Sequence, residues 1–442
     1  MLLFPLEVYH QRRAALGQLM MANSLAVFPA NPEQMRSRDT EFPFRQDSDL
    51  LYLSGFGEPE ALLLLAKDID GRLHSTILCR DKDALAEIWQ GRRLGPVAAA
   101  AKLGIDAAFS WSERHNRLRE LASNRDAIYY AQGHASGLDS LLFDTLALLR
   151  SAPKRGWRAP SILHDSRPLL AELRLIKDAH EQAVMREAGR ISAKGHMRAM
   201  RSCRPGIFEY QLEAEILHSF ALDGARQPAY STIVGGGENG CILHYTENNC
   251  RLADGQLVLI DAGAELGGYA GDITRTFPVN GRFSPPQRKL YQLVLDAQLA
   301  AIATVRPGST IEAAAAAAIR VLTAGLIELG ILQGELDALI AAEAYKPYFM
   351  HGIGHWLGLD VHDVGEYKPG GQPRPLLPGM VLTIEPGLYI AADAQVDAQW
   401  RGLGIRIEDN LLVTADGHQL LTADVVKRID DIEALMQGDA EL

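Results

Sequence analysis

The sequence contains few cysteines for its length, and this excludes one class of fold. Only four cysteines occur in 442 residues, and none of them forms a Cys-x-x-Cys pair. A disulfide-stapled secreted domain needs a higher density, and a cysteine zinc site needs that spacing. The cysteines are therefore expected to be reduced, which favours a cytoplasmic location.

The sequence also lacks long apolar runs and an excess of basic residues. No uninterrupted apolar stretch reaches the roughly 20 residues that span a bilayer. In the N-terminal stretch MLLFPLEVYHQRR the charges follow the apolar residues, which is the wrong order for a signal peptide. The formal net charge is -11, whereas nucleic acids and anionic membranes attract clustered lysine and arginine. We therefore expect neither of them as a partner.

Length and pattern predict two domains. Residues 150–170 carry three prolines and several charges without clear periodicity, and they are the predicted linker. After them, Asp178 stands three residues before Glu181, which is capping-box spacing and predicts the start of a long helix. We place a smaller α/β domain in residues 1–172 and a larger, catalytic domain in residues 173–442.

The larger domain contains an internal duplication. Two helical patterns end in Arg-Pro-Gly, at residues 204–206 and 306–308, and another helix follows each of them. The strand patterns GQLVLIDAG and GMVLTIEPG then match position by position, and a further acid-bearing strand follows each. The sequence predicts an α/β (α+β) fold with two related helix-helix-strand halves, whose acid-bearing strands meet in one curved sheet.

The acids on these strands indicate a metal site. Asp261 and Asp272 flank AGAELGGYAG, and a turn about Leu266-Gly267 would make them direct cross-strand partners on one face. Surface acids of a hairpin are the alternative, but the apolar flanks argue for burial, and buried carboxylates need partners. Glu385 and Glu408 are the equivalent acids of the second half. Two divalent cations would balance four carboxylates, and oxygen ligands with one imidazole suit Mn²⁺.

The imidazole is expected from FMHGIGHWLGLDVHD, residues 349–363, which contains His351, His355 and His362. The first two have the spacing of a zinc-binding H-E-x-x-H helix, but Gly352 replaces the glutamate. Glycine also disfavours a helix by about 1 kcal/mol relative to alanine. Spacing alone therefore leaves open which of the three histidines binds metal.

Several motifs together resemble the pita-bread metallopeptidases, in particular Xaa-Pro aminopeptidase (aminopeptidase P). They are DAGAELGGYAGDITRTFPV, HGIGHWLGLDVHD, TIEPGLY and GIRIEDN, and the likeness extends through ENGCILHYTENN and FPFRQDSDLLYLSGFGEPEA. The resemblance implies a dinuclear-metal exopeptidase, with Mn²⁺ favoured, in which a bridging hydroxide attacks. Its substrates would be peptides with proline in second position, cleaved before that proline. Prolidase, a dipeptidase of the same fold, is the alternative.

The resemblance also implies the metal ligands. Asp272 and Glu408 would bridge two metal ions, while Asp261 would bind one ion and Glu385 the other. Of the three histidines, the resemblance selects His355 as the ligand that binds the same ion as Glu385. The full implied set is Asp261, Asp272, His355, Glu385 and Glu408.

Catalytic and substrate-binding roles follow from the same resemblance. Glu385 would accept a proton, His362 would stabilise the oxyanion, and His244 with His351 would frame the proline. Tyr389 and Arg406 would support the site from behind; Arg406 shares a strand face with Glu408, so it can pair with a neighbouring carboxylate. The family forms homo-oligomers, so a dimer or tetramer is implied. Trp89 of a neighbouring subunit would approach the substrate, and Asp39 is a weaker candidate of that kind.

Other functions compete with this interpretation. GGGENG, residues 235–240, formally fits a dinucleotide fingerprint, but no helical period follows it, so we expect a loop near the substrate. A metal-free hydrolase of the creatinase kind and a peptide-binding or scaffolding protein would share the fold. Neither of these proteins requires a complete set of metal ligands. The presence of all five metal-ligand positions therefore argues against both.

Overall fold

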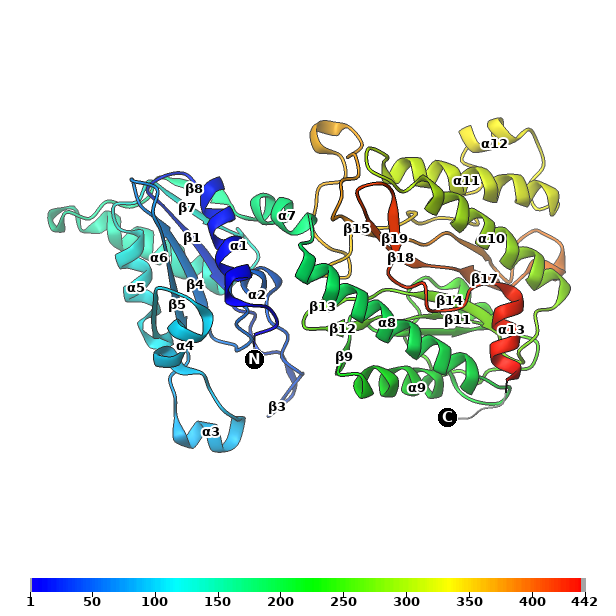
Figure 1. The fold of residues 1–442 in the computed structure, drawn as a ribbon, viewed down its shortest axis with the longest axis horizontal. Coiled ribbons are helices and arrows are strands. Elements are labelled where there is room, and N and C mark those ends of the chain that lie inside the picture. The colour runs from blue at the N-terminus through cyan, green and yellow to red at the C-terminus, as the bar shows by residue number, and fades with distance from the viewer. Residues whose placement is uncertain (1, 439–442) are drawn as a thin grey trace. The chain divides into compact units, whose positions relative to one another are not determined.

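The computed structural model describes residues 2–438 of the chain. It divides into two compact units, Met1–Leu173 and Arg174–Leu442 (Figure 1). Each unit mixes helices and strands around a hydrophobic core of its own, which confirms the predicted α/β class. Among the described residues, no helix combines the length and apolar content needed to cross a membrane.

A mixed six-stranded sheet forms the centre of the N-terminal unit, in the order β6-β5-β4-β1-β7-β8. Strand β4 is a run of leucines buried on both faces, as expected for a central strand. The bounds are β1 Ser24–Pro29, β4 Leu62–Lys67, β5 Leu73–Cys79, β6 Ala107–Ser110, β7 Ala127–Tyr130 and β8 Ile162–Asp165.

The predicted linker at residues 150–170 is wrong. Strand β8 lies inside it and pairs in parallel with β7, so that Ala127 is opposite Ile162. This edge strand has no fully buried residue, and it therefore shows none of the apolar alternation by which a strand is recognised in a sequence.

Helices pack around this sheet, and a separate two-stranded hairpin follows β1 in the chain. Trp89 lies in α3, which has no buried residue, and its side chain is 81% exposed; Asp39 is exposed in the hairpin turn. The bounds are α1 Leu6–Leu19, α2 Ser48–Ser54, α3 Ala84–Gln90, α4 Gly95–Leu103, η1 Trp111–Glu113, α5 Arg114–Ala122, α6 Ser136–Ser151, η2 Pro153–Arg155 and α7 Arg167–Leu175, with hairpin strands β2 Met35–Ser37 and β3 Thr40–Glu41.

Long helices cover the strands of the C-terminal unit (Figure 1). The predicted capping box is confirmed: the Asp178 side chain accepts from the Glu181 amide, and the Glu181 side chain accepts from the Asp178 amide. The bounds are α8 Ala179–Ser202, α9 Glu209–Leu222, α10 Pro285–Thr304, α11 Ile311–Glu328, α12 Leu336–Ala341 and α13 Ile429–Gln437.

The strands of this unit form short ladders, including β10-β11-β14, β15-β18-β19 and β16-β17. Their bounds are β9 Gln227–Pro228, β10 Ile233–Gly236, β11 Leu257–Asp261, β12 Ala264–Leu266, β13 Tyr269–Ala270, β14 Thr274–Pro278, β15 Val381–Ile384, β16 Gly387–Ile390, β17 Leu403–Arg406, β18 Asp409–Val413 and β19 His418–Leu420, with 3-10 turns η3 Gly237–Cys241, η4 Pro369–Gly371 and η5 Ala398–Trp400.

The acid-bearing strands of the two halves belong to separate ladders, which corrects the expectation of one curved sheet. The Thr276 hydroxyl, rather than a backbone group of β14, satisfies both the N–H and the C=O of Arg406. Backbone bonds also join the halves, and beside the site the Glu408 amide donates to the Thr274 carbonyl at 3.0 Å. Side-chain hydrogen bonds therefore complete the contact between the acid-bearing segments of the two halves.

Candidate metal centre and active site

Two antiparallel segments bring the first pair of acids together. Strand β11 ends at Asp261, which lies opposite Thr274 of β14. Asp272 comes two residues before Thr274, so it is a diagonal neighbour of Asp261 and not the direct partner that we expected. Residues two apart on a strand share a face, and both aspartates still face the same cavity. Gly267 and Gly268, both at positive φ, make the turn between them.

A cavity of about 540 Å³ in the C-terminal unit collects nearly all the predicted site residues of that unit. Ile233, Leu243 and Val361 contribute apolar side chains to its lining. Tyr389 lies behind the lining and bonds to two of its members. The predicted residues that line the cavity are Asp261, Asp272, His355, Glu385, Glu408, His244, His351, His362 and Arg406.

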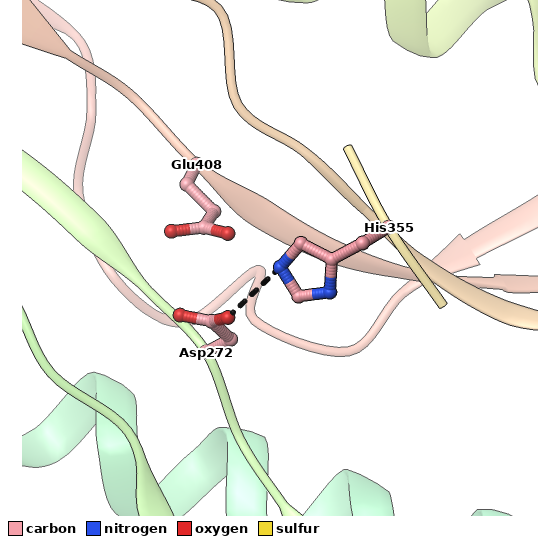
Figure 2. Close-up of side chains that lie close together, drawn as sticks. All are labelled: Asp272, His355 and Glu408. Carbon is pink, nitrogen blue, oxygen red and sulfur yellow. Dashed lines mark ion pairs between the residues drawn. The ribbon is translucent and has the colours of Figure 1, made fainter. Parts of the chain in front are cut away.

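Three side chains have the spacing of a metal site. One ligand atom from each of Asp272, His355 and Glu408 lies within 4.8 Å of the other two, and Figure 2 shows the three converging. The His355 Nε2 atom is 3.4 Å from Asp272 and 3.5 Å from Glu385. Its Nδ1 atom is 2.9 Å from the Trp356 carbonyl, which only accepts, so Nδ1 carries a proton and Nε2 faces the carboxylates.

Burial makes this cluster electrostatically costly when no cation neutralises it. Burial raises the pKa of Glu385 to about 7, and it also raises the pKa values of Asp272 and Glu408. Burial alone would lower the pKa of His355, but Asp272 and Glu385 outweigh it and raise that pKa to about 9. These four side chains thus bind protons more readily when no metal is present, as expected of groups arranged to hold a cation.

Arg406 is a buried cation beside the cluster. It pairs with Asp261 at 2.6 Å, which confirms the predicted pairing with a neighbouring carboxylate. It also donates to the Tyr389 hydroxyl at 2.9 Å, and that hydroxyl is 2.8 Å from Nε2 of His351. Since Nδ1 of His351 lies 2.8 Å from the Gly352 carbonyl, it donates there, and Nε2 accepts from Tyr389. Both ring nitrogens of His351 are therefore engaged within the protein.

Two site residues were missed by the sequence reasoning. The Tyr230 hydroxyl lies 2.5 Å from both Asp261 and Asp272. The Asn410 side chain bonds to both the N–H and the C=O of Asp272. Asn410 could have been found from its alternation with Glu408 in GIRIEDN, because both share a face. Tyr230 lies in an irregular segment, and no pattern marks it.

Comparison with known proteins identifies the family of the chain. Residues 183–415 match metallopeptidase family M24, and residues 9–129 match the aminopeptidase P N-terminal domain. The chain is 52% identical to Xaa-Pro aminopeptidase of Escherichia coli K12, over 97% of each chain. It is 55% identical to the solved structure of proline aminopeptidase P II from Yersinia pestis, with a TM-score of 0.97 over 98% of this chain and 99% of that one. Zinc-substituted E. coli aminopeptidase P in complex with product gives a TM-score of 0.96 at 52% identity, over 98% of each chain.

Fold and site together define a metallopeptidase, and the chain belongs to metallopeptidase family M24. The identity to its relatives extends across both units and includes the N-terminal domain. Within that family the chain therefore belongs with the aminopeptidase P proteins, as its motifs suggested.

Proposed function

We propose that this protein is a metal-dependent exopeptidase that removes the N-terminal residue from peptides with proline in second position. The single observation that carries the proposal is the convergence of Asp272, His355 and Glu408 in a cavity open to substrate. The name of the E. coli relative supports the specificity. Prolidase is the less favoured alternative, because the chain matches aminopeptidases along almost its whole length.

The donor set fits divalent metal ions. Two carboxylates, Asp261 and Asp272, face one Tyr230 hydroxyl, whose single proton satisfies only one of them at a time. The Nε2 atom of His355 lies 3.4–3.5 Å from carboxylate oxygens, where a bound cation would replace the proton that this cluster attracts without metal. We propose that Asp261, Asp272, His355, Glu385 and Glu408 hold two such ions. Four carboxylates and one imidazole suit Mn²⁺.

The chain's own residues would orient the substrate and move protons. Bound divalent ions lower the pKa of water and polarise a carbonyl group. Glu385, which lines the cavity 3.5 Å from Nε2 of His355, would accept a proton and return it to the leaving nitrogen of proline. Burial lowers the pKa of His362, so its neutral ring would donate a hydrogen bond to the oxygen that gains charge.

Three further histidine and tyrosine side chains would shape the substrate site. His351 has both nitrogens engaged, so it would contact proline through its ring face or edge. His244, which also lines the cavity, would contact the bound peptide from the segment after β10. Tyr389 would hold His351 in place, since its hydroxyl bonds to both His351 and Arg406.

Assembly and location belong to the proposal as well. We propose a homo-oligomer in which the exposed Trp89 and Asp39 complete a neighbour's substrate site, and a cytoplasmic location. Light scattering together with a Trp89→Ala variant tests the proposed homo-oligomer. A monomer with unchanged kinetics in that variant would contradict it, and cell fractionation tests the location.

The activity is tested by release of alanine from Ala-Pro-Ala, with Ala-Ala-Ala as the control peptide. The protein is assayed after chelation and again with Mn²⁺ restored. Cleavage confined to the proline peptide and dependent on metal is expected. Equal cleavage of both peptides would indicate a general aminopeptidase, and strong preference for Ala-Pro over Ala-Pro-Ala would indicate prolidase.

A further inference from the structure

One wall of the cavity is an irregular segment between β10 and β11. Leu243, His244 and Thr246 of this segment line the cavity. Side chains alternate along it: His244 and Thr246 are exposed, while Tyr245 between them is buried. Residues 242–250 lie outside the named strands and helices, so other contacts must determine where His244 lies.

A single buried carboxylate supplies many of these contacts. Glu209 is the first residue of α9 and has no exposed surface. Its Oε1 accepts from the Gly236 amide at 2.8 Å and from the Asn239 side chain at 3.0 Å. Its Oε2 accepts from the Tyr245 hydroxyl at 2.9 Å and from the Cys250 amide at 2.8 Å. These four donors stand at the beginning, the middle and the end of the segment.

The arrangement requires a carboxylate. A buried charge is costly unless it is fully hydrogen-bonded, and here four donors surround two oxygens. The N-terminus of a 14-residue helix also favours a negative charge at this position. A glutamine would have one acceptor oxygen and would turn its NH₂ group toward other donors. Glu209 itself is absent from the cavity lining, so it acts through the segment that it holds.

We infer that Glu209 is a positioning residue for substrate binding: it fixes the wall formed by Leu243, His244 and Thr246. This inference rests on the proposed aminopeptidase function. The proposed metal ligands lie outside the held segment 236–250, so loosening the segment weakens substrate binding and leaves metal binding intact.

The test compares Glu209→Gln with Glu215→Gln as a matched control. Glu215 lies on the same helix but pairs with Arg198 at 2.6 Å, away from the segment. With Ala-Pro-Ala and Mn²⁺, Glu209→Gln should raise KM about tenfold, equivalent to about 1.4 kcal/mol, and change kcat less than about twofold. Metal content should equal that of the parent, and the control should match the parent throughout.

Hydrogen exchange in the metal-free protein gives a readout independent of activity. Amides of residues 236–250 should exchange at least about tenfold faster in Glu209→Gln, while those of β11 should not change. If Glu209→Gln does not fold, Tyr245→Phe removes one of the four donors and should raise KM about two- to threefold.

The outcomes separate the two claims. A parent protein that is inactive on Ala-Pro-Ala would refute the proposed function. An active parent with unchanged KM and unchanged exchange in Glu209→Gln, or unchanged KM in Tyr245→Phe where that variant decides, would overturn the inference. A fall in kcat at constant KM would also overturn it.

Discussion

A buried charge cluster around Asp363, the residue after His362, should control the stability of the C-terminal unit. Asp363 pairs with Arg174 at 2.6 Å and with Lys177 at 2.9 Å, and all three side chains are at most 4% exposed. Asp363→Asn keeps the size of the side chain and removes its charge. Because two buried cations then lose a partner, the free energy of unfolding should fall by about 3–5 kcal/mol.

The matched control is Asp360→Asn. Asp360 pairs with the same Arg174 at 2.7 Å, but its side chain is 40% exposed. Solvent screens such a pair, so its loss should cost less than about 1 kcal/mol. Urea titration of both variants and the parent measures the difference, and the melting temperature of Asp363→Asn should fall by roughly 10 °C. Equal stability of the two variants would refute the reasoning.

The pairing of Asp363 with Lys177 and Arg174 also predicts how stability depends on pH. Burial by itself raises the pKa of Asp363, but Lys177 and Arg174 outweigh it, and the net pKa lies below the ordinary value. The ionised carboxylate therefore stabilises the fold above about pH 4, near the pKa of the unfolded chain, and this contribution is lost as pH falls through the folded pKa. The stability gap between parent and Asp363→Asn should be constant from pH 8 to 5 and shrink below about pH 4. A gap that widens in acid would contradict this sign.

Further predictions concern the metal centre. Asp272→Asn should reduce turnover to below about 1% of the parent with an unchanged circular dichroism spectrum, because Asn410 still holds its backbone; near-normal turnover would exclude a metal-bridging role. Tyr230→Phe removes the hydroxyl between two carboxylates and should weaken Mn²⁺ about 10- to 100-fold, which a metal titration measures; unchanged affinity would show that the hydroxyl is dispensable. Chelation should lower the melting temperature of the parent, since Mn²⁺ at 100 times its Kd adds about 2.7 kcal/mol, and a chelator without effect on scanning calorimetry would mean that no metal was bound.

Much of the fold followed from short-range patterns. The Asp178–Glu181 capping box forms as predicted because all its hydrogen bonds lie within one helical turn. Strand β4 could be recognised from four consecutive leucines. The β8 edge strand could not, since its partner β7 lies more than thirty residues away and its own residues are half-exposed or polar.

The sequence by itself determined which residue types could form the site. Equivalent positions in the duplicated strands supplied Asp261 and Glu385, and the motif around His355 supplied the imidazole. These residues follow recurrent local patterns, so their presence could be read without coordinates.

Tertiary structure alone decided how those residues are held. The Tyr230 hydroxyl reaches two aspartates 31 and 42 residues along the chain, and Glu209 bonds to groups 27 to 41 residues away. Such contacts depend on packing between elements and leave no periodic trace in the sequence. The tautomers of His351 and His355 differ from these contacts, because each ring meets the carbonyl of the next residue, and the local backbone conformation of the loop decides that contact.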